Sequence, residues 1–131
     1  MSLAAVVNLM ASLALTVNEL RNQDGKVCIA LFDTQAGFPD DDTQAVCNQC
    51  FAIDAIPLTV SFEIPYGSYA ISILHDENED GELNTGLLGI PQEGIGFSND
   101  PRIIKGTPSF ETTQFEFSKE SSAVEITIKY F

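Results

Sequence analysis

The densest group of metal-ligating side chains runs from Asp76 to Gly81, in the order Asp, Glu, Asn, Glu, Asp, Gly. Asp76, Asn78 and Asp80 place oxygen atoms at alternate positions, and the glycine that follows lets the chain curl so that these oxygens converge on one hard cation. Glu82 can add its backbone carbonyl. This spacing is that of the first half of a calcium loop, so it predicts a Ca2+ site at Asp76, Asn78, Asp80 and Glu82.

The run departs from an EF-hand in its second half. Leu87 stands at the twelfth position, where an EF-hand has a bidentate Glu, and no helical pattern flanks the loop. The missing carboxylate must then come from water or from elsewhere in the chain, and the candidates are Asp33, Glu93 and Asp100. A second interpretation of the same residues is an Asx-turn, in which the side-chain oxygens cap nearby backbone amides in a solvated acidic loop.

Cys28, Cys47 and Cys50 are the three cysteines, and the last two have the CxxC spacing of redox and zinc sites. Here the pair precedes the strand-like run 51–56 instead of opening a helix, and His75 is the only histidine, so no second pair of zinc ligands exists. Three cysteines favour one disulfide and one spare thiol. We favour Cys28 with Cys50, while Cys28 with Cys47 stays open; in the cytosol all three would be reduced and buried.

His75 is the only histidine in the sequence, so it is the only histidine that could act as a general base. It has the parity of Ile71 and Ile73 on a predicted strand, which places its ring on their face. An enzyme of the hydrolase type would use His75 with Asp76 or Glu93 as acid and base. No nucleophile elbow of the GxSxG kind accompanies it, which favours a packed, hydrogen-bonded imidazole.

The charge balance excludes two classes of partner. Six Lys and Arg against 19 Asp and Glu give a net charge of −13, and 13 of the acids lie between Val27 and Pro101, where there is no basic residue. Such a surface repels nucleic acid and anionic bilayers. We therefore expect neither nucleic acid binding nor membrane insertion.

Period-two alternation positions these residues. It is clearest where Leu58, Val60, Phe62 and Ile64 interleave with polar residues, and no window has helical apolar spacing. Seven strands are predicted, near 13–20, 26–33, 46–54, 57–64, 68–75, 112–118 and 123–130. Seven short strands predict one all-β domain, an antiparallel sandwich with one long acidic loop between residues 76 and 111.

Turn residues predict how neighbouring strands connect. The Asp24–Gly25 pair is typical of a tight hairpin, so the first two strands should be antiparallel neighbours. Pro65, Tyr66 and Gly67 separate the fourth strand from the fifth, and the polar residues 119–122 have the length of a last hairpin loop.

The amino terminus is set apart from the predicted domain. Residues 3–15 are apolar except for Asn8 and Ser12, which resembles the apolar region of a secretory signal, although no Lys or Arg precedes it. We interpret 1–12 as a signal remnant or an added leader and 13–131 as the single domain, which predicts an extracytoplasmic protein, periplasmic or secreted.

Two stretches resemble a known family. They are LRNQDGKVCIALFDTQAGFP (residues 20–39) and IPYGSYAISILHDENEDGELNTGLLGIPQEGIGFSND (residues 64–100), which resemble a family of small exported bacterial proteins of uncharacterised function with an HDxNxDGxL motif followed by GIPxExxGFSN. Gly86 stands where relatives usually have a polar residue. The PYGSY element resembles the PxGxY turn of transthyretin-like and carboxypeptidase regulatory domains, which implies an immunoglobulin-like, prealbumin-type sandwich. The family has no assigned activity.

Together these observations favour a non-catalytic extracytoplasmic module. In this hypothesis the long acidic loop, ordered by Ca2+, presents a binding surface to a protein or a glycan. The alternatives are the hydrolase built on His75 and a purely structural subunit whose acidic loop keeps the surface hydrated.

Overall fold

Alternating side chains build two β-sheets in the computed structural model, which describes residues 10–78, 93–103 and 106–131. The strands are β1 (Met10–Asn18), β2 (Lys26–Phe32), β3 (Cys47–Ala52), β4 (Leu58–Pro65), β5 (Gly67–Asp76), β6 (Gly94–Phe97), β7 (Phe115–Phe117) and β8 (Ala123–Thr127). Two short helical turns, η1 (Asp42–Gln44) and α2 (Phe110–Thr113), lie in the connections. All seven predicted strands are present, and β6 is additional.

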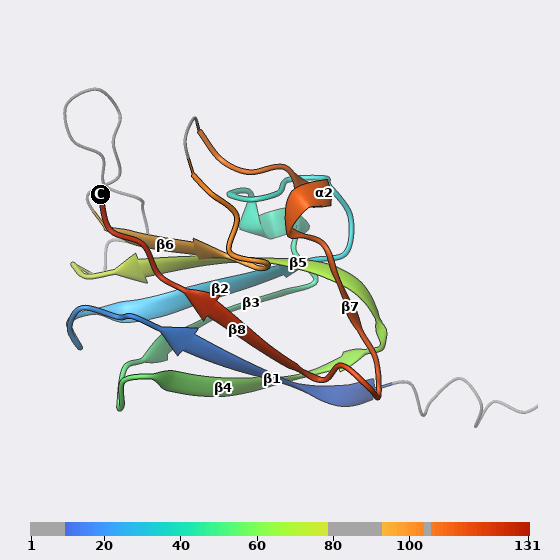
Figure 1. The fold of residues 1–131 in the computed structure, drawn as a ribbon, viewed down its shortest axis with the longest axis horizontal. Coiled ribbons are helices and arrows are strands. Elements are labelled where there is room, and N and C mark those ends of the chain that lie inside the picture. Colours follow the sequence, from blue (N-terminus) through green and yellow to red (C-terminus); the bar gives the residue numbers. More distant parts are fainter. Residues whose placement is uncertain (1–9, 79–92, 104–105) are drawn as a thin grey trace, which may run out of the picture.

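The two sheets stack as layers, with the larger one above the smaller in Figure 1. The three-stranded sheet has the order β4-β1-β8, and the five-stranded sheet has the order β3-β2-β5-β6 with β7 paired to β5. Every strand pair is antiparallel except β1 with β8, which is parallel. The expected all-β sandwich is therefore confirmed, while its immunoglobulin-like, prealbumin type stays a prediction.

The core lies between the sheets and is filled by one side of each alternating strand. On β4, Leu58, Phe62 and Ile64 are buried while the intervening Thr59, Ser61 and Glu63 are exposed. β1 and β5 each contribute an inward row, and these rows are Leu13, Leu15 and Val17 on β1 and Tyr69, Ile71 and Ile73 on β5. Burial of these side chains is the main stabilising term of the sandwich.

The predicted hairpin between the first two strands is wrong. β1 pairs with β4 and β8 in the smaller sheet, whereas β2 belongs to the larger sheet, so the chain crosses between layers. Leu20, 5% exposed, anchors this crossover in the core. Gly25 has φ +65° and lies so close to β5 that a Cβ there would be 1.9 Å from the Asp76 carbonyl oxygen. Glycine at this position therefore allows the connection before β2 to pack closely against the end of β5.

The last predicted hairpin is also corrected. Ser118 and Ser121 form a tight turn with reciprocal backbone hydrogen bonds of 3.1 Å. The strands on either side then separate, because β7 pairs with β5 and β8 pairs with β1. A polar connector of this length therefore joins two layers here.

The long segment after β5 contains β6, which the sequence did not reveal. Its inward positions are Gly94 and Gly96, and a Cβ at Gly94 would lie 2.5 Å from both Ile128 and the Tyr130 ring. This close approach lets Ile95 and Lys129 exchange two backbone hydrogen bonds of 3.0 and 2.8 Å. One side of the sandwich is thereby closed.

At the amino-terminal side, β1 begins at Met10, inside the segment 1–12 that the sequence set apart as a leader. Residues 1–9 lie outside the described residues. Within the part of the chain that the structure describes, no helix is long and apolar enough to span a membrane.

Candidate functional site

The predicted calcium ligands fall at the end of β5. Asp76 is the last residue of that strand and is 3% exposed, and Asn78 follows it at the surface. Asp80 and Glu82 lie outside the described residues. Within residues 10–78, 93–103 and 106–131, no three His, Cys, Asp or Glu side chains are grouped to hold a metal ion. The structure thus places two of the four predicted ligands, and the ion itself stays a prediction.

Of the three further carboxylates considered, only Glu93 lies beside this strand end. It is 4% exposed, and its Oε2 accepts a hydrogen bond of 2.8 Å from the Glu77 backbone N–H. Asp33 follows Phe32, which pairs with Ala70. Ala70 lies six residues before Asp76 on β5, so Asp33 is about 20 Å from that strand end. Asp100 accepts a 2.8 Å hydrogen bond from the Thr127 backbone N–H, beside the other sheet.

The His75 ring is fully buried, and protein groups bond both of its nitrogens. Nε2 lies 2.8 Å from the Asp24 carbonyl oxygen, and Nδ1 lies 2.8 Å from the Tyr130 hydroxyl. Because a carbonyl only accepts, Nε2 donates to the Asp24 carbonyl, and in the neutral ring Nδ1 accepts from the Tyr130 O–H. That hydroxyl also accepts from the Arg21 backbone N–H at 3.1 Å. The ring has no nitrogen left for a substrate, so this geometry gives the His75 hydrolase alternative no support.

Arg21 and Glu77 hold the chain where it leaves β5. The Arg21 guanidinium donates to both Glu77 carboxylate oxygens, with Nε 3.0 Å from Oε2, and lies 4.4 Å from the centre of the Tyr130 ring. Asn22 donates to the same Oε2 at 2.7 Å. The hydrogen bond from Arg21 lowers the pKa of Glu77 below its ordinary value of 4.5. Burial acts in the opposite direction and raises this pKa, whereas the hydrogen bond from Asn22 lowers it further. Burial raises the pKa of Tyr130, which keeps its hydroxyl protonated as a donor.

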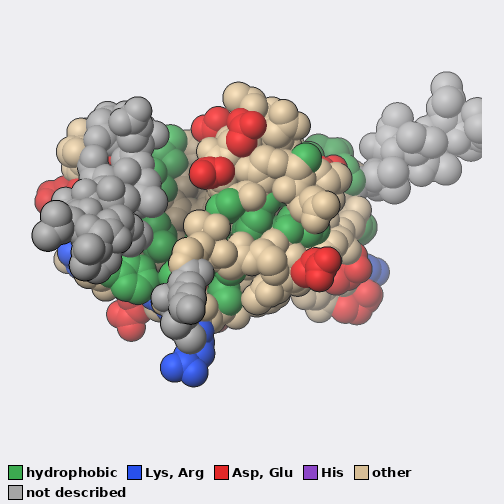
Figure 2. Space-filling view, turned by 90° about the horizontal axis from the view of Figure 1, so that it is seen from above, with side chains coloured by type: hydrophobic (Ala, Val, Ile, Leu, Met, Phe, Trp, Pro, Cys, Tyr) green, Lys and Arg blue, Asp and Glu red, His purple; other side chains and the backbone are tan. Residues whose placement is uncertain are grey.

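A second feature, which sequence reasoning missed, is a pocket of about 330 Å3 on the outer face of the five-stranded sheet. Two cross-strand rows form its floor, and the strand register aligns them. The first row is Cys50, Cys28, Leu74 and Ile95, and the second is Asn48, Ala30, Ser72 and Phe97. Figure 2 shows this face, with hydrophobic side chains gathered in a depression and acidic side chains beside it.

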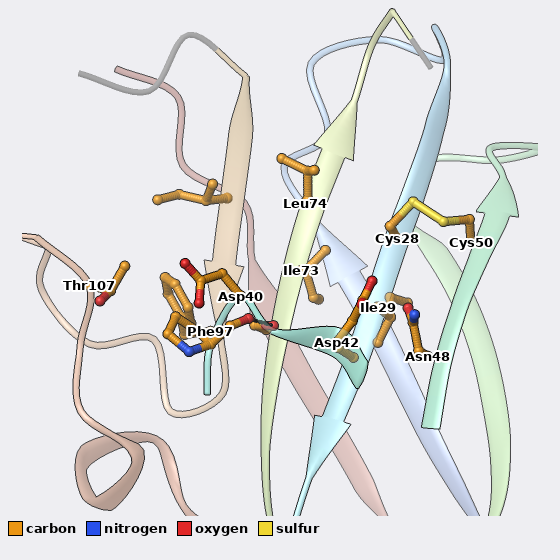
Figure 3. Close-up of a pocket in the computed structure, with 14 residues that line it drawn as sticks. Cys28, Ile29, Asp40, Asp42, Asn48, Cys50, Ile73, Leu74, Phe97 and Thr107 are labelled. Atoms are coloured by element: carbon orange, nitrogen blue, oxygen red, sulfur yellow. Dashed lines mark hydrogen bonds between the residues drawn. A yellow bond between two sulfur atoms is a disulfide. The ribbon is translucent and has the colours of Figure 1, made fainter. Parts of the chain in front are cut away.

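The connection 33–46 is held over this floor. The Phe38 ring packs edge-on against the rings of Phe32, Phe97 and Phe110, with centroid distances of 5.4, 6.1 and 5.8 Å. The Ser72 hydroxyl donates to the Pro39 carbonyl at 2.9 Å. These contacts fix the segment that carries Asp40 and Asp42, which line the pocket (Figure 3).

One sequence signal could have revealed that this face is covered. From Val27 to Phe32 every residue is apolar, so alternation is lost. A continuous apolar run is typical of a strand buried on both faces. The inward set Val27, Ile29 and Leu31 fills the core, and Ala30 and Phe32 are buried on the outer face.

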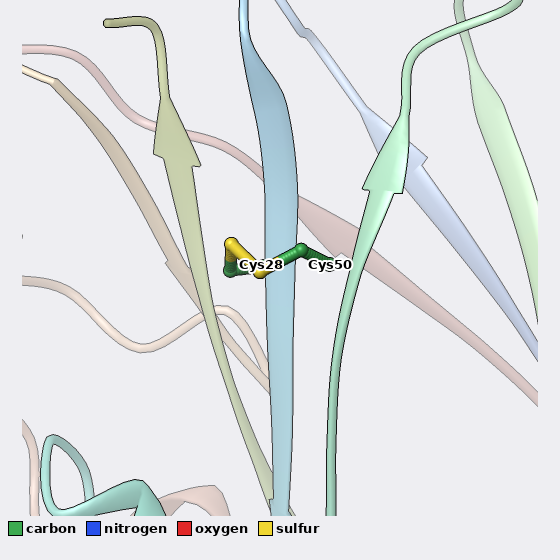
Figure 4. The surroundings of a disulfide bond; sticks show 2 residues. All are labelled: Cys28 and Cys50. Atoms are coloured by element: carbon green, nitrogen blue, oxygen red, sulfur yellow. A yellow bond between two sulfur atoms is a disulfide. The ribbon is translucent and has the colours of Figure 1, made fainter. Parts of the chain in front are cut away.

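The disulfide joins Cys28 to Cys50, the favoured pair, across directly opposed residues of β2 and β3 (Figure 4). Cys47 is the free cysteine and packs against the core. Cys47 and Cys50 are three positions apart, and in a strand an odd difference in position places side chains on opposite faces. This parity excludes the alternative pair of Cys28 with Cys47 in the observed register. Burial raises the pKa of the Cys47 thiol.

The fold and the site together define a small all-β sandwich protein with an apolar pocket on the outside of its larger sheet. Residues 15–125 match the model of a family, DUF2141, described as an uncharacterized protein conserved in bacteria, and the chain belongs to this family. No curated protein matches it, and no solved structure does.

The Glu77 contacts generate a prediction about pH. Because the folded state lowers the pKa of Glu77, its ionised form contributes stability that is present above about pH 4.5 and is lost as the pH falls through the folded-state value. Glu77→Gln should lower the unfolding free energy at pH 7 by up to about 1 kcal/mol. Urea denaturation at several pH values should show the difference from wild type shrinking below pH 4.5.

Glu120→Gln is the matched control, since Glu120 is exposed on the tight turn before β8. It should change the unfolding free energy little at any pH. A Glu77→Gln deficit that is the same at pH 7 and pH 3 would contradict the assignment of the ionised carboxylate as the stabilising form.

Proposed function

We propose that this chain is a non-catalytic β-sandwich binding module that acts outside the bacterial cytoplasm. The observation that carries the proposal is the pocket of about 330 Å3 on the outer face of the larger sheet. Ligand sites in proteins are mostly apolar concavities of about 300–1,000 Å3 with a few polar groups. This pocket has that composition, and the ring contacts of Phe38 hold the connection 33–46 above it.

The chemistry of the described residues favours binding over catalysis. Both His75 nitrogens are used within the protein. The free thiol of Cys47 packs against the core, and its raised pKa disfavours the thiolate that a nucleophile requires. Nothing in the described part of the chain therefore supplies an activated nucleophile with its base.

The disulfide supports the extracytoplasmic part of the proposal, because structural disulfides form and persist in oxidising compartments. To test this, bacterial cells are lysed in denaturant that contains an alkylating agent and no reductant. Mass spectrometry should then find one modified cysteine, Cys47. Three modified cysteines would place the protein in a reducing compartment and contradict this part.

The binding proposal is tested with an uncharged, mostly apolar probe, so that binding depends on the apolar pocket and not on the charge of the ligand. 2-Phenylethanol, titrated to millimolar concentration, should shift the amide signals of Leu74, Ile95 and Phe97 in two-dimensional NMR spectra. Ala30→Phe, which fills the floor, should abolish these shifts, whereas Ser61→Ala on the exposed side of β4 should leave them unchanged. Shifts spread over both sheets, or none, would contradict a ligand pocket at this place.

The acidic segment after β5 is the second part of the proposal: ordered by Ca2+, it presents a surface to a protein or a glycan. Its support is that Asp76 and Asn78 emerge from β5 beside the buried Glu93 carboxylate. A calcium site of the affinity found in extracellular modules stabilises a fold by about 1–2 kcal/mol at 5 mM Ca2+. The expected result is a higher melting temperature with Ca2+ than with EDTA.

Asp80→Asn should remove most of that shift, and Asp54→Asn, an exposed carboxylate outside the run, should preserve it. Absence of both binding heat and a melting shift at 5 mM Ca2+ would eliminate the ion from the proposal.

A further inference from the structure

The pocket has one acidic wall. Asp40 and Asp42 line it from the connection 33–46, two residues apart, and both are exposed (Figure 3). Among the described residues that line the pocket there is no Lys, Arg or His. The carboxylate of the intervening Asp41 is used locally, since it accepts hydrogen bonds from the backbone N–H and hydroxyl of Thr43.

This wall selects the charge of a ligand. Within the described part of the chain, neither Asp40 nor Asp42 has a side-chain hydrogen bond or ion pair, so water alone solvates both carboxylates. A ligand that covers the wall removes that water, which costs free energy unless the ligand supplies donors or positive charge. Neutral ligands compensate poorly, and anions are repelled by these carboxylates and by the net charge of −13.

The floor selects the body of the ligand. Leu74, Ile95 and Phe97 contribute apolar surface next to the Cys28–Cys50 disulfide. A volume of about 330 Å3 equals about eleven times the roughly 30 Å3 that one water occupies in the liquid. The space therefore suits an alkyl or aryl group of about ten non-hydrogen atoms rather than a folded partner.

We propose that this pocket binds a small organic cation, a primary amine on a short aryl or alkyl chain. The ammonium group lies at Asp40 and Asp42, where it donates charge-assisted hydrogen bonds. The apolar body lies on the floor between β2 and β6. The inference rests on the proposed binding function and adds the chemical class of the ligand.

The test compares three probes of nearly equal size: 2-phenylethylamine, 2-phenylethanol and phenylacetate. Isothermal titration calorimetry at low salt should give the amine an affinity at least tenfold above that of the alcohol, and should give phenylacetate no heat. Added NaCl should weaken amine binding and leave alcohol binding unchanged, because salt screens an exposed ion pair.

The paired variant Asp40→Asn/Asp42→Asn should lower the affinity for the amine to that for the alcohol. The control Asp54→Asn/Glu120→Gln changes the net charge by the same amount at exposed positions outside the pocket and should bind the amine as wild type does. Circular dichroism would reveal a folding defect in the paired variant. In that case the single Asp40→Asn and Asp42→Asn variants provide the test, and each should lose part of the affinity for the amine.

Equal affinities for amine and alcohol, with no effect of the Asp40→Asn/Asp42→Asn pair, would overturn the cation assignment while the binding pocket itself stands. Failure of all three probes to bind would overturn the pocket and the cation together. Preference for phenylacetate would reverse the inferred sign of the ligand charge.

Discussion

β2, an inner strand of the five-stranded sheet, is apolar on both faces, and this constraint organises the molecule. One face packs against the three-stranded sheet to form the core. The other must also be removed from water, although among the described residues no third sheet covers it. Phe38, on the connection 33–46, supplies the cover by packing with Phe32 and Phe97, and Phe110, on α2, packs against Phe38. Because this cover is incomplete, it leaves the pocket.

Strand positions could be predicted because period-two alternation is a local property of the chain. β4 is the clearest case, since its buried and exposed residues alternate from Leu58 to Glu63. β6 was missed because its inward positions, Gly94 and Gly96, carry no side chain, so the pattern has no apolar signal on that face. The pairing of β1 with β4 and β8 was missed because it depends on the crossover at Leu20, which a turn dipeptide does not encode.

The candidate site divides in the same way. Parity placed the His75 ring on the core face and separates Cys47 from Cys50, and both follow from residue spacing alone. The proximity of Glu93 to the end of β5 requires β6 to fold back, and the pocket requires the connection 33–46 and the segment that carries Thr107 to meet over one sheet. Such long-range arrangements have no local signature, so only the tertiary structure reveals them.

The parallel pairing of β1 with β8 constrains the order of events during biosynthesis. Ala14 pairs with Ala123, 109 positions later, so the smaller layer has no third strand until the last part of the chain has emerged. Contacts of such large sequence separation slow folding, since a long loop must close before they form. Until then the row Leu13, Leu15 and Val17 is open on one side, and a nascent chain that stops short of β8 is a natural substrate for chaperones and proteases.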